Sequence, residues 1–264
     1  MGTAVEVAPD LFSLKGRNIV VVGGAGGIGR GLAQGFVTYG GRVAIADIND
    51  GAMADVSKEI EAATGERVLS YSVNTDQESS VQELVAKAAA DMGRVHVLVN
   101  AQGFNIKSAA TEFPMEAWDK LFSVNVRGVM MCCKNFAAHM VEQGGGKIIN
   151  MSSIRGQRGA LGGNLGYCST KGAIDMMTKQ LGVELAAKNV QVNALGPIIT
   201  ITPMTEETVK KDASRYEKVL QNIPMGRMGR VSDLIGPAVF LASAASDFVT
   251  GTILYPDGGT MAFV

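Results

Sequence analysis

Residues 19–29 read IVVVGGAGGIG, an apolar run that passes directly into a cluster of glycines. Consecutive β-branched residues predict a buried strand, and the apolar spacing over 28–39 predicts a helix after the glycines. Glycines at such a junction let the chain turn tightly and let the backbone approach a pyrophosphate, which the helix N-terminus stabilises. The stretch therefore predicts a dinucleotide-binding turn in a parallel α/β sheet. A purely structural turn is the alternative interpretation.

The alternation of strand-like and helix-like segments continues along the chain. Short apolar runs stand at 19–22, 43–46, 68–73, 95–99, 147–151, 190–195 and 252–255. Amphipathic stretches of helical length separate them, at 28–39, 52–63, 77–91, 115–141, 167–187 and 231–245. This order predicts a doubly wound (Rossmann) α/β fold, in which a parallel seven-stranded sheet has helices on both faces.

The pattern predicts a single dinucleotide-binding catalytic domain over 15–264, which follows an N-terminal extension of residues 1–14. The segment 198–224 departs from the alternation, because a Pro-marked turn leads into a long polar connection with helical character over 206–222. Long connections at strand ends often form lids over ligands, so we expect a substrate lid here. A plain surface helix pair is the alternative.

Composition narrows the function classes. The 264 residues carry 24 basic and 25 acidic side chains, and a net charge of −1 argues against a nucleic-acid or membrane-surface protein. The charged fraction of 19% is below the roughly 25% of average domains, which suggests surface hidden in an oligomer. Three cysteines and two histidines lack ligand-type spacing, so we expect no metal site. Without a long apolar run or a leader pattern, we expect no transmembrane helix, no signal peptide and a cytoplasmic protein.

Two glycine spacings within the turn match dinucleotide-binding patterns, namely Gly24-Gly26-Gly29 and Gly23-Gly27-Gly29. Asp47 ends the second strand, where a carboxylate can accept hydrogen bonds from the adenosine ribose hydroxyls. The same charge repels a 2′-phosphate, so the sequence predicts NAD rather than NADP. A simple strand-end cap is the alternative role for Asp47.

Tyr167 and Lys171 stand four residues apart at the start of a helical segment, which places them on one face. A phenol has a pKa near 10 and is a poor base at neutral pH. A neighbouring ammonium stabilises the phenolate and lowers that pKa. The pair therefore predicts a general base for a secondary alcohol, or a general acid for a ketone.

With these motifs in order, the sequence resembles the short-chain dehydrogenase/reductase family from about residue 15 to 259. The resemblance rests on the glycine turn, on the Tyr167–Lys171 pair, and on the segments 99–103, 122–126, 148–153, 192–197, 202–204, 240–243 and 257–259. It implies catalytic roles for Asn125, Ser153, Tyr167 and Lys171. It implies a homotetramer built on the helices 115–141 and 167–187. It also implies cofactor contacts from Gly23, Gly27, Ile28, Gly29, Asp47, Asn74, Asn100, Tyr167, Lys171, Pro197 and Thr202.

In these implied roles Ser153 hydrogen-bonds the substrate oxygen and Tyr167 transfers the proton. Lys171 binds the nicotinamide ribose and tunes Tyr167, and Asn125 holds a water that links Lys171 to solvent. Several positions depart from the family pattern, three of them at implied contact residues or beside them. Asn74 stands where an Asp commonly contacts the adenine, and Ile198 replaces a Gly. Ser153 precedes the tyrosine by one residue more than usual, so Ser152 stays a second candidate.

For the substrate, the segments 154–159, 197–198 and 234–241 are similar to gluconate 5-dehydrogenases and related sugar-acid and polyol dehydrogenases. Arg155 suits a substrate carboxylate, and Asn105 suits a hydroxyl, although both are also ordinary loop residues. A 3-oxoacyl-thioester reductase is the alternative within the family. A non-catalytic NAD-sensing protein is the alternative of another class, since a fold does not by itself establish a function.

Overall fold

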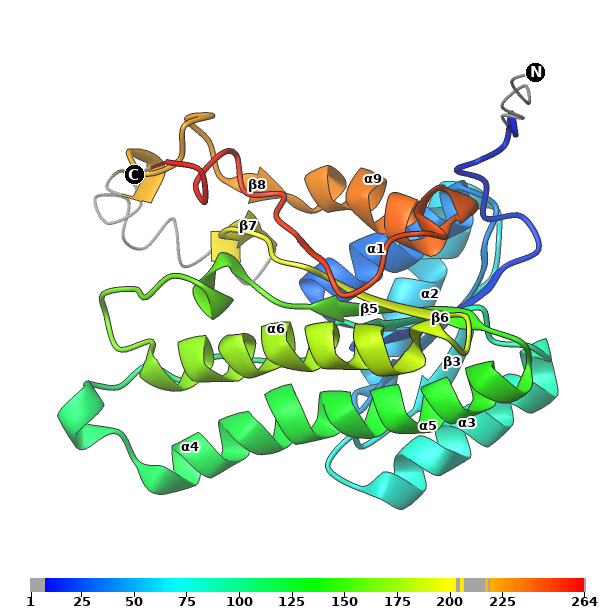
Figure 1. Ribbon diagram of the computed structural model, residues 1–264, viewed down its shortest axis with the longest axis horizontal. Helices are drawn as coiled ribbons and strands as arrows, with labels where there is room; N and C mark the ends of the chain where they lie inside the picture. Colours follow the sequence, from blue (N-terminus) through cyan, green and yellow to red (C-terminus); the bar gives the residue numbers. More distant parts are fainter. Residues whose placement is uncertain (1–7, 203–204, 207–216, 218, 264) are drawn as a thin grey trace.

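The structure is a computed structural model that describes residues 8–202, 205–206, 217 and 219–263. Its centre is a seven-stranded sheet with the strand order β3-β2-β1-β4-β5-β6-β9 (Figure 1). Every neighbouring pair in this sheet is parallel. The strands are β1 Asn18–Val22, β2 Arg42–Asp47, β3 Leu69–Ser72, β4 Val97–Asn100, β5 Gly146–Met151, β6 Val190–Leu195 and β9 Ile253–Leu254.

Helices cover both faces of the sheet. Figure 1 places α1, α2 and α9 on one side, and α3, α4, α5 and α6 on the other. The helices are α1 Gly27–Thr38, α2 Asp50–Thr64, α3 Glu78–Met92, α4 Met115–Phe122, α5 Val129–Glu142, α6 Leu165–Ala186 and α9 Val231–Ala242. Three short 3₁₀ turns are η1 Ala110–Glu112, η3 Ile154–Gly156 and η4 Ala244–Ser246.

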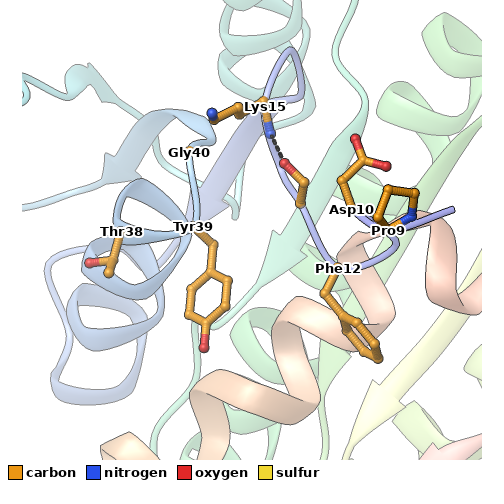
Figure 2. A pocket seen from close by; sticks show the side chains of 8 residues that line it. Pro9, Asp10, Phe12, Lys15, Thr38, Tyr39 and Gly40 are labelled. Carbon is orange, nitrogen blue, oxygen red and sulfur yellow. Dashed lines mark hydrogen bonds between the residues drawn. The ribbon is translucent and has the colours of Figure 1, made fainter.

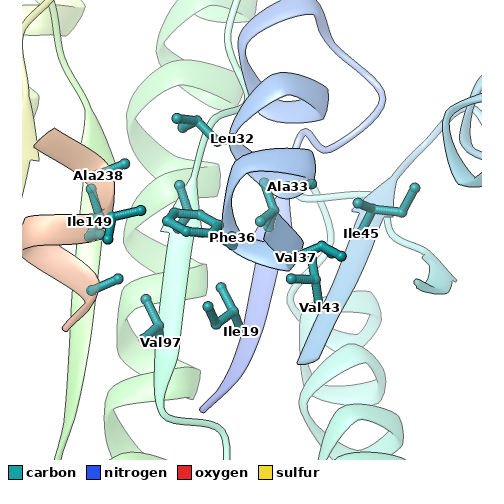
Figure 3. Packing of buried hydrophobic residues seen from close by; sticks show 14 of the residues in the cluster. Ile19, Leu32, Ala33, Phe36, Val37, Val43, Ile45, Val97, Ile149 and Ala238 are labelled. Carbon is teal, nitrogen blue, oxygen red and sulfur yellow. The ribbon is translucent and has the colours of Figure 1, made fainter. Parts of the chain in front are cut away.

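Alternate residues of the strands supply two separate cores, because successive side chains in a strand point to opposite faces. From β1, Ile19 and Val21 belong to the core under α1, α2 and α9, which contains Phe36 from α1 (Figure 3). Val20 and Val22 belong to the core under α3, α5 and α6. Both faces of the strand are therefore buried, which explains why its sequence is continuously apolar.

The predicted doubly wound fold is confirmed, with two differences of detail. The helix expected over 115–141 is divided by a π-helical segment, η2 Ser123–Gly128, which lies between α4 and α5. A second, two-stranded sheet of β7 Thr200–Ile201 and β8 Gly229–Arg230 was not expected, because two-residue strands leave no periodic pattern. About half of the predicted lid, at 203–204, 207–216 and 218, lies outside the described residues.

A surface hollow separates the N-terminal segment from the C-terminal end of α1 (Figure 2). It is lined by residues that include Phe12, Thr38 and Tyr39. The glycine turn lies at the other end of α1, about 18 Å away at the rise of a twelve-residue helix. This hollow is therefore remote from the predicted site. In the described part of the chain, no helix is long and apolar enough to span a membrane, and no three His, Cys, Asp or Glu side chains gather as metal ligands would.

Candidate active site

The predicted site residues converge at the carboxyl ends of the parallel strands. The glycine turn follows β1, and Ser152 and Ser153 follow β5. Between them in the sheet lies β4, and the strand order reverses between β1 and β4. In open α/β sheets a ligand crevice forms at such a reversal, outside the carboxyl ends of the strands.

The glycine turn is a close-packed cradle that requires glycine at several positions. Gly23 has a φ of +76°, and a Cβ there would lie 2.5 Å from the Gln102 backbone nitrogen. A Cβ at Gly29 would overlap the Gly23 carbonyl oxygen. Helix α1 begins at Gly27, so its first backbone N–H groups have no carbonyl partner within the helix. The half-buried Ile28 packs its side chain against the core, which leaves the backbone of this turn available to phosphates.

Asp47 lies beside this turn at the end of β2. Its carboxylate accepts a hydrogen bond from the Ala25 backbone nitrogen at 3.2 Å and another from Asn49, also at 3.2 Å. Asp47 therefore caps the chain at the end of β2 and also lies beside the glycine turn. The side chain is only half-buried, so an acceptor oxygen remains accessible beside the cradle.

Tyr167 and Lys171 share one face of α6, as the spacing predicts. The Lys171 ammonium lies 5.5 Å from the centre of the Tyr167 ring and donates to the Met151 carbonyl oxygen at 2.6 Å. Burial lowers the pKa of Lys171 to about 8, while the negative charge of Asp175 acts in the opposite direction. Burial also raises the pKa of Tyr167, against which a hydrogen bond with Ser153 and the charge of Arg155 act. The Ser153 hydroxyl and the Arg155 charge therefore favour the phenolate, but burial, the largest effect, favours the neutral phenol.

The two consecutive serines point to different partners. The Ser153 hydroxyl is the one that acts on Tyr167, whose pKa it lowers. It donates to the Pro197 carbonyl oxygen at 3.4 Å and accepts from the Arg155 backbone nitrogen at 3.2 Å. The Ser152 hydroxyl donates to the Asp175 carboxylate inside the protein. This geometry favours Ser153 over Ser152 as the hydroxyl for a substrate, despite the unusual spacing to Tyr167.

Asn125 lies in the π-helical segment, fully buried, with its side chain bonded to the chain that follows β4. Its amide donates to the Phe104 carbonyl oxygen at 2.9 Å and accepts from the Phe104 nitrogen at 3.1 Å. A Cβ at Gly103 would stand 3.2 Å from the Asn125 Oδ1 and 3.8 Å from the Lys171 Nζ, so the three residues are adjacent. The structure thus brings Asn125 next to Lys171, and π-helical turns are frequent at functional sites.

Two of the predicted cofactor contacts lie beside the glycine turn or the serine turn, whereas two others have side chains that are hydrogen-bonded elsewhere in the protein. Thr202 packs on the glycine turn, where a Cβ at Gly27 would lie 2.7 Å from the Thr202 Cβ. Pro197 lies beside the serine turn, with its carbonyl oxygen 3.2 Å from the Ile154 nitrogen. By contrast, the Asn74 Oδ1 accepts from the Asp76 nitrogen at 3.0 Å, which closes its own turn. The Asn100 amide is buried and donates to Asn150 at 2.9 Å, within the protein.

The predicted substrate contacts belong to two facing loops. Arg155 lies in η3, donates to the Gly159 carbonyl oxygen at 2.8 Å and acts electrostatically on Tyr167. Asn105 donates to Asn164 at 3.0 Å, which links the chain after β4 to the start of α6. Both side chains therefore border the site that contains Ser153 and Tyr167.

Two residues of this site were not predicted. Asp175 is buried on α6, and Tyr255 follows β9. Burial and then the charge of Asp175, with which Tyr255 also hydrogen-bonds, raise the pKa of Tyr255 to about 12. An acidic residue in an amphipathic helix usually faces solvent, and only its position four residues after Lys171 could have indicated that Asp175 shares the inner face.

These residues fit a nicotinamide dinucleotide. The cradle of Gly23 and Gly29 has no room for a side chain, which is the condition for close approach of a pyrophosphate. Asp47 offers a carboxylate on the adenosine side, and Lys171 offers an ammonium on the side of Tyr167.

Comparisons with known proteins find relatives that match nearly the full length of this chain. The family described as enoyl-(acyl carrier protein) reductase matches residues 23–261. The 5-keto-D-gluconate 5-reductase of Escherichia coli is 36% identical over 255 residues, which cover 97% of this chain and 99% of the relative. The gluconate 5-dehydrogenase of Gluconobacter oxydans is 36% identical over 95% of this chain and 97% of its own. A solved gluconate 5-dehydrogenase from Burkholderia cenocepacia, in complex with NADP and tartrate, is 32% identical with a TM-score of 0.90 and covers 97% and 99% of the two chains.

Proposed function

The chain belongs to the short-chain dehydrogenase/reductase family, and from this premise we propose that it interconverts a secondary alcohol and a ketone in a sugar acid or polyol, with NAD(H). The observation that carries this proposal is the arrangement of Ser153, Tyr167 and Lys171. A phenol beside a buried serine hydroxyl and a buried ammonium is suited to proton transfer.

In the proposed reaction each of these side chains has one task. Ser153 donates a hydrogen bond to the substrate oxygen. Tyr167 gives its phenolic proton to that oxygen during reduction and takes the proton back during oxidation. The Lys171 ammonium stabilises the phenolate and hydrogen-bonds the nicotinamide ribose, while Asn125 holds the water that connects Lys171 to solvent. When bound, the nicotinamide supplies or receives the hydride.

We propose NAD as the preferred dinucleotide, on the strength of Asp47. Its carboxylate beside the glycine turn suits the two ribose hydroxyls and opposes a phosphate at the 2′ position. The solved relative from Burkholderia cenocepacia contains NADP, so family membership alone does not decide between the two cofactors. Asn74 would take the adenine-side position, and the pyrophosphate would be held by Gly23, Gly27, Gly29 and Thr202.

The sugar-acid class is supported by the named relatives and by Arg155. The relatives act, by name, on gluconate or 5-keto-D-gluconate. Arg155 is the guanidinium nearest in sequence to Ser153, and its charge reaches Tyr167. A carboxylate of the substrate would therefore meet a cation close to the reacting carbon, with Asn105 as a donor to a hydroxyl.

The experiment that tests the proposal is a substrate screen with the purified protein. Keto-sugar acids, neutral ketoses and 3-oxoacyl thioesters are each offered with NADH and with NADPH, and cofactor consumption is followed. We expect turnover of keto-sugar acids, faster with NADH. Turnover of the thioesters alone would assign the chain to the alternative activity. Dinucleotide binding without turnover of any class would favour a non-catalytic sensor.

We also propose a homotetramer built on α4, α5 and α6. The exposed faces of these helices contain large apolar residues, namely Met115, Met130, Met176 and Val183. Light scattering after size exclusion tests this proposal, with four times the 27.6 kDa chain mass as the expected result.

A further inference from the structure

Asp175 is a buried carboxylate behind the proposed catalytic residues. Its side chain is 2% exposed. One carboxylate oxygen accepts from the Ser152 hydroxyl, and the other accepts from the Gln157 amide at 2.7 Å. Tyr255 hydrogen-bonds the same carboxylate. Donors from the end of β5, from the loop after η3 and from the chain after β9 therefore meet at this one side chain.

Packing keeps Asp175 close to these partners. A Cβ at Gly156 would overlap the Asp175 Oδ2 and would lie 2.9 Å from the Lys171 carbonyl oxygen. Gly156 is thus the residue that lets η3 approach α6. These donor groups satisfy carboxylate oxygens that are buried away from water.

The charge of Asp175 acts on Lys171, one helical turn before it. Lys171 is 5% exposed and faces Tyr167 on its own helix and Gly103 in the chain after β4. Of the charged and titratable groups around this cluster, Arg155 in η3 acts on Tyr167, Asp257 acts on Tyr255, and Asp175 acts on Lys171. A buried lysine loses its proton easily unless an anion opposes that loss.

We propose that Asp175 is a positioning residue for the proposed reaction, whose buried carboxylate keeps the Lys171 side chain in its ammonium form beside Tyr167. The consequence follows from the shared titration of Tyr167 and Lys171. The first proton that this pair loses can come either from Tyr167 or from Lys171. Only the phenolate–ammonium form can accept a proton from an alcohol. Without Asp175, loss from Lys171 is favoured, and the competent form becomes rarer by about tenfold for each pH unit by which the Lys171 pKa falls.

The test measures the charge of Lys171 directly, in the full-length protein without cofactor. Lysine labelled with ¹³C at the ε carbon gives a signal for Lys171 whose position follows its protonation, and Lys171→Arg assigns that signal. Asp175→Asn removes the charge and keeps the size of the side chain. Asp175→Ser, measured alongside, also lacks the charge and leaves more room against Gly156. Glu184→Gln removes an exposed carboxylate from the same helix and is the matched control.

We expect the titration midpoint of Lys171 to fall by about one pH unit or more in Asp175→Asn and Asp175→Ser, and to stay unchanged in Glu184→Gln. We also expect kcat for alcohol oxidation to fall about tenfold per unit of that shift. An unchanged Lys171 midpoint overturns the proposal even if activity is lost, because a purely structural role would lower activity and stability only. Failure of both Asp175 variants to fold overturns it in the same way. The expected fall in kcat rests on the proposed function, whereas the expected shift in the Lys171 titration does not. A failure of the proposed function can therefore be distinguished from a failure of the inference about Asp175.

Discussion

The Lys171 ammonium lies 5.5 Å from the centre of the Tyr167 ring, one turn further along α6. Burial raises the pKa of Tyr167 and lowers that of Lys171 to about 8. Burial therefore opposes the charged form of each residue, while the charge of Asp175 favours the Lys171 ammonium and the charge of Arg155 favours the Tyr167 phenolate. Because the two side chains are adjacent, we expect a change at either residue to impair the proposed proton transfer.

Replacement of Tyr167 by Phe removes the proposed proton donor and acceptor but keeps the ring over Lys171. We expect kcat to fall by about 10²- to 10⁴-fold, which is the usual contribution of a positioned acid or base, while NAD affinity stays within a few-fold. Steady-state kinetics and a dinucleotide titration by fluorescence measure the two effects. The control is Tyr39→Phe, at an exposed residue remote from the site. A Tyr167→Phe variant that oxidises alcohols as fast as the wild type would contradict the proposed mechanism.

The lowered pKa of Lys171 predicts how stability depends on pH. In the folded protein Lys171 loses its proton near pH 8, whereas in the unfolded chain it does so near 10.5. Between these values the unfolded state binds more protons, so the contribution of Lys171 to the free energy of unfolding rises with pH. The rise amounts to about 3 kcal/mol over the window.

Chemical denaturation checks this rise in a background without the tyrosine titration. The free energy of unfolding of Tyr167→Phe is compared with that of the double variant Tyr167→Phe/Lys171→Met, from pH 8 to 10.5. We expect the difference to move in favour of the lysine-containing protein as pH rises. A difference that is flat or falls with pH would mean that Lys171 keeps its proton throughout this range.

Asp47 is expected to determine the choice between NAD and NADP. Two unit negative charges 4 Å apart repel by about 1 kcal/mol even in water, which corresponds to about fivefold in affinity. We therefore expect Asp47→Ala to reduce the ratio of kcat/KM for NAD over NADP by about fivefold or more. Kinetics with each cofactor measure this ratio. Asp50→Ala, at an exposed acid at the start of α2, is the control, and a ratio unchanged by Asp47→Ala would limit Asp47 to its capping role.

Arg155 is expected to recognise the carboxylate of the substrate. A hydrogen bond to a charged group contributes about 1.5–3 kcal/mol, so Arg155→Ala should raise KM for a keto-sugar acid by roughly 10- to 100-fold. The KM for a neutral ketose of the same length should change little. Arg158, which donates to backbone oxygens near the C-terminus, offers a comparison at a neighbouring arginine. Equal losses for acidic and neutral substrates would show that Arg155 acts on the loop rather than on the carboxylate.

Most of the fold was predictable because buried parallel strands have a simple pattern. Val97 and Val99 of β4 face one core, and Leu98 faces the other, so the strand is apolar throughout. The Tyr167–Lys171 pair was predictable for a similar reason, since a four-residue spacing in a helix places two side chains on one face.

The rest of the site depends on contacts that no local pattern reveals. The π-helical turn at Asn125 lies directly between two α-helices, so a single helix was the natural prediction over that region. The difference between Ser152 and Ser153 depends on Asp175, a residue 23 positions later in the chain than Ser152. Asp175 itself has an unremarkable sequence context, and only tertiary packing makes it a buried carboxylate.

The glycine cradle predicts opposite effects for two Gly→Ala changes. A Cβ at Gly29 would overlap the Gly23 carbonyl oxygen, which is backbone and cannot rotate away. We expect Gly29→Ala to lower the free energy of unfolding by about 1–3 kcal/mol and to weaken NAD binding. Gly236 lies within α9 with open space around the position of its Cβ. Gly236→Ala should therefore stabilise the protein by at most about 0.5 kcal/mol, because the higher helix propensity of alanine is partly offset by the steric restriction that Pro237 places on the residue before it.

Thermal and urea denaturation of both variants, with and without NAD, measure these effects. The added NAD should stabilise Gly236→Ala as much as it does the wild type, and should stabilise Gly29→Ala much less, since only Gly29 belongs to the turn that approaches the pyrophosphate. If NAD stabilised both variants equally, the backbone of this turn would not be the phosphate site. In that case the requirement for glycine at position 29 would be structural only, as the alternative interpretation of the glycine cluster holds.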